Sequence, residues 1–292
     1  MLNGSMVALI TPLEGDEIDE ESLRRLVNYQ EDNGIDVLVP CGTTGESATL
    51  SHEEHNRVIE IVADEASKAQ VMAGTGSNST HEAIAMSKHA QGVGCDALLV
   101  ITPYYNKPPQ RGMEEHYRRI ADEVDTDVIL YNVPSRTGIN LEAETVARLA
   151  EHKNIAGIKE ASGDLGQVSE IITNTPEDFA VVSGDDSLTL PILSVGGDGV
   201  VSVIANIIPD RISELVHSFQ SGDTFRSQQI HQENHPLMEA MFWETNPMPV
   251  KAAASKLGLC KNELRSPMSE LDSDLELRLE NLMEEVGLEI HG

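Results

Sequence analysis

The sequence predicts an α/β fold of one kind, a closed (β/α)8 TIM barrel with a C-terminal helical extension. Short apolar runs of strand type alternate with longer segments of helical periodicity, and eight such runs lie before residue 203. The runs are apolar throughout, which is typical of parallel strands that are buried on both faces. Eight strand–helix units favour a closed barrel over an open doubly wound sheet, and 292 residues with 40% hydrophobic content suffice for one large core.

Each predicted strand is an uninterrupted apolar run, and the eight fall at residues 5–10, 37–39, 71–73, 97–101, 128–131, 155–158, 180–182 and 199–202. Helices are predicted at 19–33, 51–69, from 80 onward, 112–124, 141–152, 165–174, 188–194 and from 209 onward. Gly34 ends the first helix, and Ser51 with Glu54 forms the pattern of a capping box at the start of the second.

Three more helical patterns follow the last strand unit, at 223–244, 249–257 and 274–286. We therefore expect two parts, a catalytic barrel over residues 1–222 and a helical extension over 223–292 that packs on the barrel.

The formal net charge is −29, from 49 acidic and 20 basic residues spread along the chain. Such a surface repels the phosphates of nucleic acids and of acidic lipids, so neither is an expected partner. No apolar run is long enough for a membrane span, and the N-terminus lacks the pattern of a signal peptide, so we expect a cytoplasmic protein. The acidic excess motivates the hypothesis that the protein is halophilic, with salt ions screening its self-repulsion; a melting temperature unaffected by molar KCl would refute it.

The sequence gives no sign of a metal or nucleotide cofactor. Cys41, Cys95 and Cys260 lie far apart without a metal-type pair, which indicates reduced thiols. His52 and His55 are three residues apart, whereas the zinc motif H-E-x-x-H needs a spacing of four. No glycine-rich pattern matches a phosphate-binding loop or a dinucleotide fingerprint.

Polar residues follow five of the predicted strands, where a barrel of this kind places its active site. They lie in the segments 42–47, 102–106, 131–138, 159–163 and 183–186. Lys159 is the most informative, because it ends the apolar run 155–158. Burial disfavours the charged form of an amine, and a neutral amine is the nucleophile that forms a Schiff base with a ketone. The alternative is a strand-end lysine that extends to solvent, which Lys159 considered alone would favour.

Three other features have a functional and a structural interpretation. The Gly42–Gly45 loop with Thr43 and Thr44 could cradle a carboxylate, although such clusters are commonly ordinary loops. Tyr131 could carry protons in the site or be a core residue with a satisfied hydroxyl. Arg136 could clamp a carboxylate or form a surface ion pair in so acidic a chain.

Taken together, these segments resemble the dihydrodipicolinate synthase (4-hydroxy-tetrahydrodipicolinate synthase) family within the N-acetylneuraminate lyase superfamily. The resemblance runs from Ala8-Leu9-Ile10-Thr11-Pro12 to the segments 246–251 and 264–268, and its specific parts are 42–50, 103–106, 131–138 and 158–163. It implies that pyruvate forms a Schiff base with Lys159, becomes an enamine and attacks L-aspartate 4-semialdehyde, without a separate cofactor. The cyclic product, 4-hydroxy-tetrahydrodipicolinate, opens the diaminopimelate branch of lysine synthesis.

The resemblance also implies roles for individual residues. Thr43, Tyr105 and Tyr131 match a proton relay, with Tyr105 donated by a neighbouring subunit of a homotetramer built from two dimers. Thr44 matches the residue that binds the pyruvate carboxylate, and Arg136 matches the one that binds the carboxylate of the second substrate. Gly184 and Val201 match backbone positions beside the lysine, where the family commonly has isoleucine in place of Val201.

A regulatory site is implied as well. In family members that L-lysine inhibits, the effector lies at a subunit interface, and the matching positions here are Ser47, Ala48, His52, His55, Asn78, Glu82 and Tyr104. The alternative is that these polar residues satisfy a tight dimer interface.

Two other functions stay open at this point. A sugar-acid aldolase of the same superfamily would use Lys159 and Tyr131 to act on a 2-keto-3-deoxy acid, although Arg136 and Tyr105 argue against it. A catalytically silent pyruvate-binding relative would be free to lose some of the matching residues, and none is missing here.

Overall fold

The structure, a computed structural model that describes residues 2–290, is a closed barrel of eight parallel strands. Around the barrel the order is β1 (Gly4–Ala8), β10 (Gly199–Ser202), β9 (Ala180–Ser183), β8 (Ile155–Glu160), β7 (Asp127–Asn132), β6 (Ala97–Ile101), β5 (Gln70–Gly74) and β4 (Val37–Val39). β1 pairs with both β4 and β10, which closes the sheet. The predicted barrel is confirmed.

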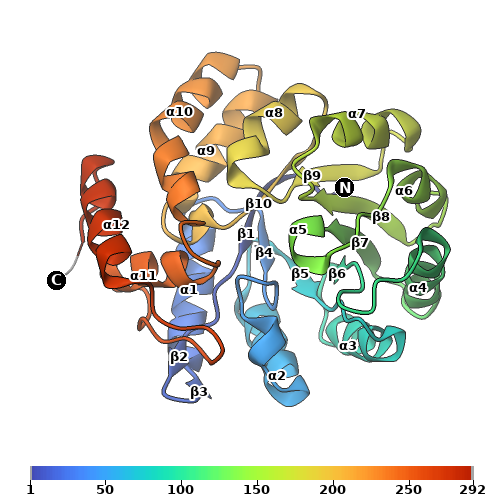
Figure 1. Ribbon diagram of the computed structural model, residues 1–292, viewed down its shortest axis with the longest axis horizontal. Coiled ribbons are helices and arrows are strands. Elements are labelled where there is room, and N and C mark those ends of the chain that lie inside the picture. Colours follow the sequence, from blue (N-terminus) through green and yellow to red (C-terminus); the bar gives the residue numbers. More distant parts are fainter. Residues whose placement is uncertain (1, 291–292) are drawn as a thin grey trace.

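Helices surround the strands (Figure 1). The outer layer contains α1 (Glu20–Asp32), α2 (His52–Glu65), α3 (Thr80–Gly92), α4 (Gln110–Asp122), α6 (Ala143–Leu149), α7 (Leu165–Asn174), α8 (Thr189–Ser194) and α9 (Pro209–Gln220). The predicted capping box of α2 is present, because Ser51 accepts from the backbone of Glu54 and the Glu54 carboxylate accepts from the backbone of Ser51.

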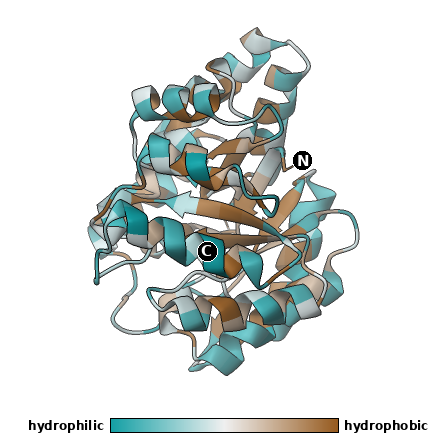
Figure 2. Ribbon diagram, turned by 90° about the vertical axis from the view of Figure 1, so that its right-hand side faces the viewer, coloured by the Kyte–Doolittle hydropathy of each residue, from teal (hydrophilic) through white to brown (hydrophobic). Residues whose placement is uncertain are grey.

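Strand side chains form two apolar layers. Inward-facing residues such as Met6, Met72, Ile129 and Val201 fill the barrel. Outward-facing strand residues pack against the helices in a larger layer. Figure 2 shows the result, with hydrophobic strands at the centre and helices whose outer faces are hydrophilic. The continuous apolar runs of the sequence follow from this burial on both faces.

The chain after α9 forms α10 (Thr224–Ala240), α11 (Met248–Lys256) and α12 (Ser273–Glu285). α10 packs on α9, and α12 packs on both α10 and α11. The loop between α11 and α12 reaches the first part of the chain, where Glu263 accepts from the backbone N–H of Gly15 at 2.5 Å and Lys261 pairs with Glu14.

Short elements outside the barrel layers were not expected from the sequence. They are the hairpin of β2 (Leu13–Glu14) and β3 (Glu17–Ile18), the one-turn helix α5 (Pro134–Thr137), and the 3-10 turns η1 (Ser47–Thr49), η2 (Asp186–Leu188) and η3 (Ile204–Asn206). Each is too short to produce a hydrophobic period. α5 and η2 nevertheless matter for the site, because they follow the carboxyl ends of β7 and β9, where a barrel of this kind has its active site.

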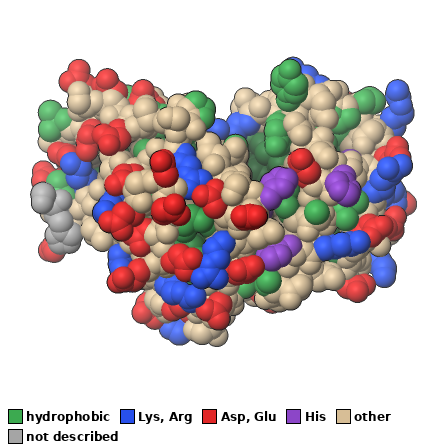
Figure 3. Space-filling view, turned by 90° about the horizontal axis from the view of Figure 1, so that it is seen from below, with side chains coloured by type: hydrophobic (Ala, Val, Ile, Leu, Met, Phe, Trp, Pro, Cys, Tyr) green, Lys and Arg blue, Asp and Glu red, His purple; other side chains and the backbone are tan. Residues whose placement is uncertain are grey.

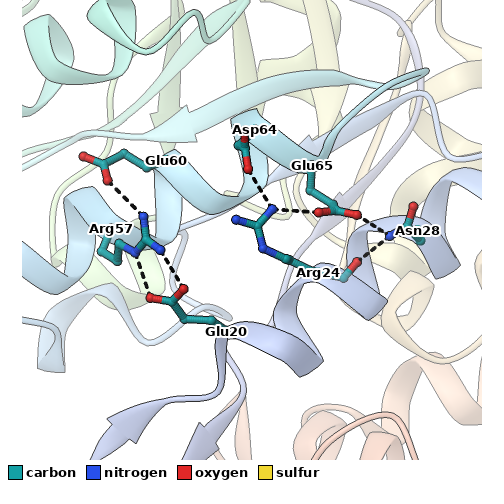
Figure 4. Close-up of polar contacts among 7 residues, drawn as sticks. All are labelled: Glu20, Arg24, Asn28, Arg57, Glu60, Asp64 and Glu65. Atoms are coloured by element: carbon teal, nitrogen blue, oxygen red, sulfur yellow. Dashed lines mark hydrogen bonds and ion pairs between the residues drawn. The ribbon is translucent and has the colours of Figure 1, made fainter.

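Acidic and basic side chains are interspersed on the face seen in Figure 3. Between α1 and α2, two arginines each bind two carboxylates (Figure 4): Arg57 contacts Glu20 and Glu60, and Arg24 contacts Asp64 and Glu65. Sharing of this kind is expected where acidic groups outnumber basic ones. None of the helices within residues 2–290 has the length and apolar character needed to cross a membrane.

Candidate active site

A cavity of about 540 Å³ opens at the carboxyl ends of the barrel strands. Its walls come from the segments that follow the strands and from the loop between α10 and α11. The lining residues include Gly42, Thr43, Thr44, Tyr131, Ser135, Arg136, Lys159, Gly184, Asp185, Val203, Phe242, Glu244 and Asn246. Of the residues predicted for catalysis and substrate binding, the cavity brings together Thr43, Thr44, Tyr131, Arg136, Lys159 and Gly184.

Lys159 and Tyr131 occupy matching positions on the paired strands β8 and β7. Their side chains are 6% and 7% exposed, and the Lys159 Nζ lies 4.3 Å from the centre of the Tyr131 ring. Among residues 2–290, no carboxylate forms an ion pair with this amine. The lysine is therefore buried without a structural charge partner and is directed to the cavity, so the interpretation of a strand-end lysine extending to solvent does not apply.

Gly184 allows the lysine to lie where it does. A Cβ at this position would come within 3.0 Å of the Lys159 Cε and within 2.7 Å of the Ala161 side chain. A larger residue would therefore displace the lysine chain. Glycine is needed here for close approach.

A polar network lies behind the lysine, on the other face of the same two strands. Glu160 is 2% exposed and accepts from the side-chain amides of Asn132 and Gln167 and, at 2.7 Å, from the backbone N–H of Ser162. Burial raises the pKa of Glu160, and these hydrogen bonds oppose the shift. Asn132 also accepts from the backbone of Leu141. The network fixes the ends of β7 and β8 relative to each other, and its side chains were not among the predicted site residues.

The Thr43–Thr44 loop is held on several sides. Thr44 is 3% exposed, and its hydroxyl accepts from the Asn246 side-chain amide at 2.9 Å. Thr11 donates to the backbone carbonyl of Gly45 at 2.7 Å, and a Cβ on Gly45 would lie 2.9 Å from the carbonyl oxygen of Leu9. The loop therefore lies tightly on the end of β1.

Arg136 is on α5 at the mouth of the cavity and donates to the backbone carbonyl of Asn246 at 3.3 Å. Asn246 thus contacts both of the predicted carboxylate-binding elements, yet it was not among the predicted site residues. The signal available for it was the run Asn246-Pro247-Met248-Pro249, which interrupts helical periodicity.

Two predicted site residues lie elsewhere in the single chain. Val201 is fully buried on β10 in the inner barrel layer, and its side chain does not line the cavity. The expected role of Val201 concerns its backbone beside the lysine and stays a prediction. Tyr105 is 90% exposed in the turn after β6, has φ +69°, and does not line the cavity.

The predicted effector positions occupy η1, α2, the segment from the end of β5 into the first turn of α3, and the turn after β6. Asn106 of this turn donates to the backbone carbonyl of Asn78, and Ser77 donates to the Glu82 carboxylate at 2.7 Å. Tyr104 is 39% exposed. Ser47 is half-buried, and Ala48 and His52 are exposed. His55 is buried, which lowers its pKa to about 4.

A buried lysine at the carboxyl end of a parallel (β/α)8 barrel, facing a polar cavity, places the chain among the barrel enzymes that use this end for chemistry. Its residues 1–286 match the profile of the dihydrodipicolinate synthetase family, and the chain belongs to that family. The family prediction made from the sequence is confirmed.

Relatives that match over the full length of the chain belong to the same family. The 4-hydroxy-tetrahydrodipicolinate synthase of Citrifermentans bemidjiense is 50% identical over 99% of this chain and 100% of its own. The crystal structure of dihydrodipicolinate synthase from Aquifex aeolicus has a TM-score of 0.98 at 44% identity and covers 100% of both chains. The enzyme from Cyanidioschyzon merolae with lysine bound has a TM-score of 0.95 at 42% identity and covers 98% of both chains.

Proposed function

We propose that the protein is a 4-hydroxy-tetrahydrodipicolinate synthase that condenses pyruvate with L-aspartate 4-semialdehyde through a Schiff base on Lys159. The observation that carries this mechanism is the buried Lys159 amine, which faces the cavity beside Tyr131 and has no carboxylate ion partner within the described part of the chain. Because the amine is not used in a structural ion pair, it is available to a ketone.

The chemistry proceeds in five steps. The Lys159 nitrogen adds to the ketone carbon of pyruvate, and water leaves to give an imine. Loss of a methyl proton gives the enamine, whose carbon attacks the aldehyde carbon of the semialdehyde while the aldehyde oxygen gains a proton. The amino group of the adduct then attacks the imine carbon and displaces Lys159, which closes the ring and restores the enzyme. No separate cofactor is required.

Each proton transfer needs a group within reach, and hydroxyl groups held in a chain carry protons in both directions. Tyr131 and Thr43 line the cavity and supply two such groups. Tyr105 supplies the third from a neighbouring subunit, which is consistent with its 90% exposure in the single chain. The catalytic unit is therefore a dimer, and two dimers form a tetramer.

The two substrates are anions, and the protein has a net charge of −29, so local donors must bind their carboxylates. The Thr44 backbone and hydroxyl bind the pyruvate carboxylate near Lys159. Arg136, at the mouth, binds the carboxylate of the semialdehyde in a bidentate manner. Holding the enamine next to the aldehyde supplies much of the rate enhancement by proximity.

L-Lysine acts as an inhibitor at the site formed by Ser47, Ala48, His52, His55, Asn78, Glu82 and Tyr104. The lysine-bound relative from Cyanidioschyzon merolae supports this proposal. Glu82 supplies the negative charge for an effector ammonium group, and Tyr104 adjoins the relay residue Tyr105. Millimolar L-lysine should lower the rate, whereas full activity at saturating lysine would exclude the site.

The experiment that tests the proposed function is a parallel assay of two aldehydes with pyruvate. L-Aspartate semialdehyde should be consumed rapidly, and glyceraldehyde, the partner of a sugar-acid aldolase, should react far more slowly. A preference for glyceraldehyde would identify a sugar-acid aldolase. No turnover of either by protein that binds pyruvate would indicate a silent relative.

A further inference from the structure

An ion pair between Lys251 and Glu46 is buried completely in the molecule. The two side chains are 0% and 3% exposed, and the Lys251 Nζ lies 2.5 Å from a Glu46 oxygen. Lys251 also donates to the backbone carbonyl of Glu263 at 2.6 Å, and the second Glu46 oxygen accepts from the backbone N–H of Arg265 at 3.1 Å. The two charged groups are therefore paired and hydrogen-bonded on both sides.

Glu46 belongs to the loop that carries Thr43 and Thr44. Its backbone N–H donates to the carbonyl of Thr43 at 3.1 Å, its carbonyl accepts from the N–H of Thr49 at 2.9 Å, and its φ is +56°. The left-handed conformation is uncommon for a residue with a side chain and is held here by its contacts. The Glu46 carboxylate is therefore carried by a turn whose backbone is hydrogen-bonded to residues on both sides of it.

Besides Thr11, three partners of this loop come from one stretch of the C-terminal chain. Asn246 holds the Thr44 hydroxyl at 2.9 Å, Lys251 holds Glu46, and Arg265 donates to the carbonyl of Thr49 at 3.2 Å. Three successive anchors thus fix the loop from Thr44 to Thr49 against the region around α11. None of the anchors comes from the barrel strands.

A purely stabilising role does not account for this pair. A buried ion pair adds little net stability, because the cost of removing both charges from water offsets their attraction. Its geometry is nevertheless strict, since either charge moved away from the other would be left buried and unpaired. Such a pair is suited to fixing one geometry.

We propose that Lys251 and Glu46 are positioning residues for pyruvate: through their ion pair, the C-terminal extension sets the position of the Thr43–Thr44 loop. The inference rests on the proposed role of Thr44 in binding the pyruvate carboxylate. It assigns to the extension a part in substrate binding that the barrel alone does not perform.

α11 provides a matched control for the experiment. Lys256 lies on the same helix as Lys251. Its ion partners are Glu276 and Glu280 of α12 and not residues of the Thr43–Thr44 loop. Lys256→Met removes the same charge from the same helix and breaks two ion pairs, but the Thr43–Thr44 loop keeps its anchors.

The test compares this control with the double variant Glu46→Gln/Lys251→Met, which removes both buried charges and nearly preserves volume. The Michaelis constants for pyruvate and semialdehyde are measured, and the active fraction is counted by borohydride trapping of pyruvate. Because small displacements of a binding group are costly, the pyruvate KM should rise about tenfold in the double variant. The semialdehyde KM should stay within about twofold, and Lys256→Met should change neither.

A merely structural pair would lower the active fraction and leave the pyruvate KM of the remaining enzyme at the wild-type value, and this result would overturn the inference. Should the double variant not fold, Glu46→Asp keeps both charges and draws the carboxylate back by one methylene. A raised pyruvate KM in that variant supports the inference, and an unchanged one refutes it. Absence of trapping in wild-type protein would instead refute the proposed function.

Discussion

Lys159 and Tyr131 lie directly opposite each other in the register of β8 and β7, with the lysine Nζ 4.3 Å from the centre of the tyrosine ring. Their strand neighbours Glu160 and Asn132 are also opposite each other and are hydrogen-bonded at 3.0 Å on the outer face. One strand pair therefore delivers the nucleophile and a proton carrier inward while a polar network behind them fixes its register.

This arrangement leads to a prediction for Tyr131→Phe. The ring that packs on the lysine is kept, and only the hydroxyl is lost. Loss of one proton-transfer group costs about 10²–10⁴ in rate, so kcat should fall by about that factor while the melting temperature stays close to that of wild type. Steady-state kinetics and thermal unfolding measure the two quantities. A variant with wild-type kcat would exclude Tyr131 from the relay.

Arg136→Ala should weaken binding of the semialdehyde and leave pyruvate binding unchanged. The Arg136 guanidinium is at the mouth of the cavity, and its contact with the protein is the Asn246 carbonyl at 3.3 Å. A hydrogen bond to a charged group contributes about 1.5–3 kcal/mol. Loss of the charge-assisted clamp should therefore raise the semialdehyde KM by about 10-fold or more. Trapping of pyruvate on Lys159 should proceed as in wild type. Unchanged kinetics would rule out the clamp.

Glu31 gives a prediction about stability and pH. Burial would raise its pKa, but backbone hydrogen bonds from Ala69, Lys68 and Ser67 and the Ser67 hydroxyl outweigh burial and lower the pKa to about 2. A depressed carboxyl pKa stabilises the folded state above the unfolded value of 4.5, and this contribution is lost as the pH falls toward 2. A shift of this size corresponds to about 3 kcal/mol.

Glu31→Gln should therefore lower the free energy of unfolding by about 2–3 kcal/mol at pH 7, and the difference from wild type should disappear near pH 2. Urea unfolding at several pH values measures it. Asp32→Asn is the control, because this exposed neighbour makes only a surface pair with Lys68. An equal effect of both substitutions, or one independent of pH, would contradict the account.

Salt should stabilise the protein. The chain carries 49 acidic against 20 basic residues, and exposed pairs such as those between α1 and α2 contribute little each. At 1 M ionic strength the Debye length is about 3 Å, so repulsion among surface carboxylates is largely screened. The melting temperature should rise from low salt to molar KCl. A melting temperature that does not change with KCl would refute the halophilic proposal.

The barrel could be predicted from the sequence because the strands are apolar runs that alternate with helical patterns. Most helix ends lie within a few residues of their predicted positions. The cavity residues from Thr43 to Gly184 could be predicted because each lies at the end of a strand or in the segment that follows it. Asn246 could not, because it reaches the site from a loop about 200 residues away along the chain from Thr44. The prolines after it indicate a loop in the sequence, but they do not indicate which part of the barrel that loop contacts.

The same limit applies to the ion pair of Lys251 and Glu46. Charged residues in a sequence are expected at the surface, and nothing near either one in the sequence indicates that both are buried. Only the folded chain shows that a helix of the extension supplies the partner of a carboxylate in the Thr43–Thr44 loop.

The central claim is that Lys159 is the nucleophile, and borohydride reduction in the presence of pyruvate tests it most directly. The account predicts one pyruvate-derived adduct per chain, located on Lys159 by peptide mass mapping, and none in Lys159→Arg. Folded protein that gives no adduct at any salt concentration, or an adduct on another lysine, would contradict it.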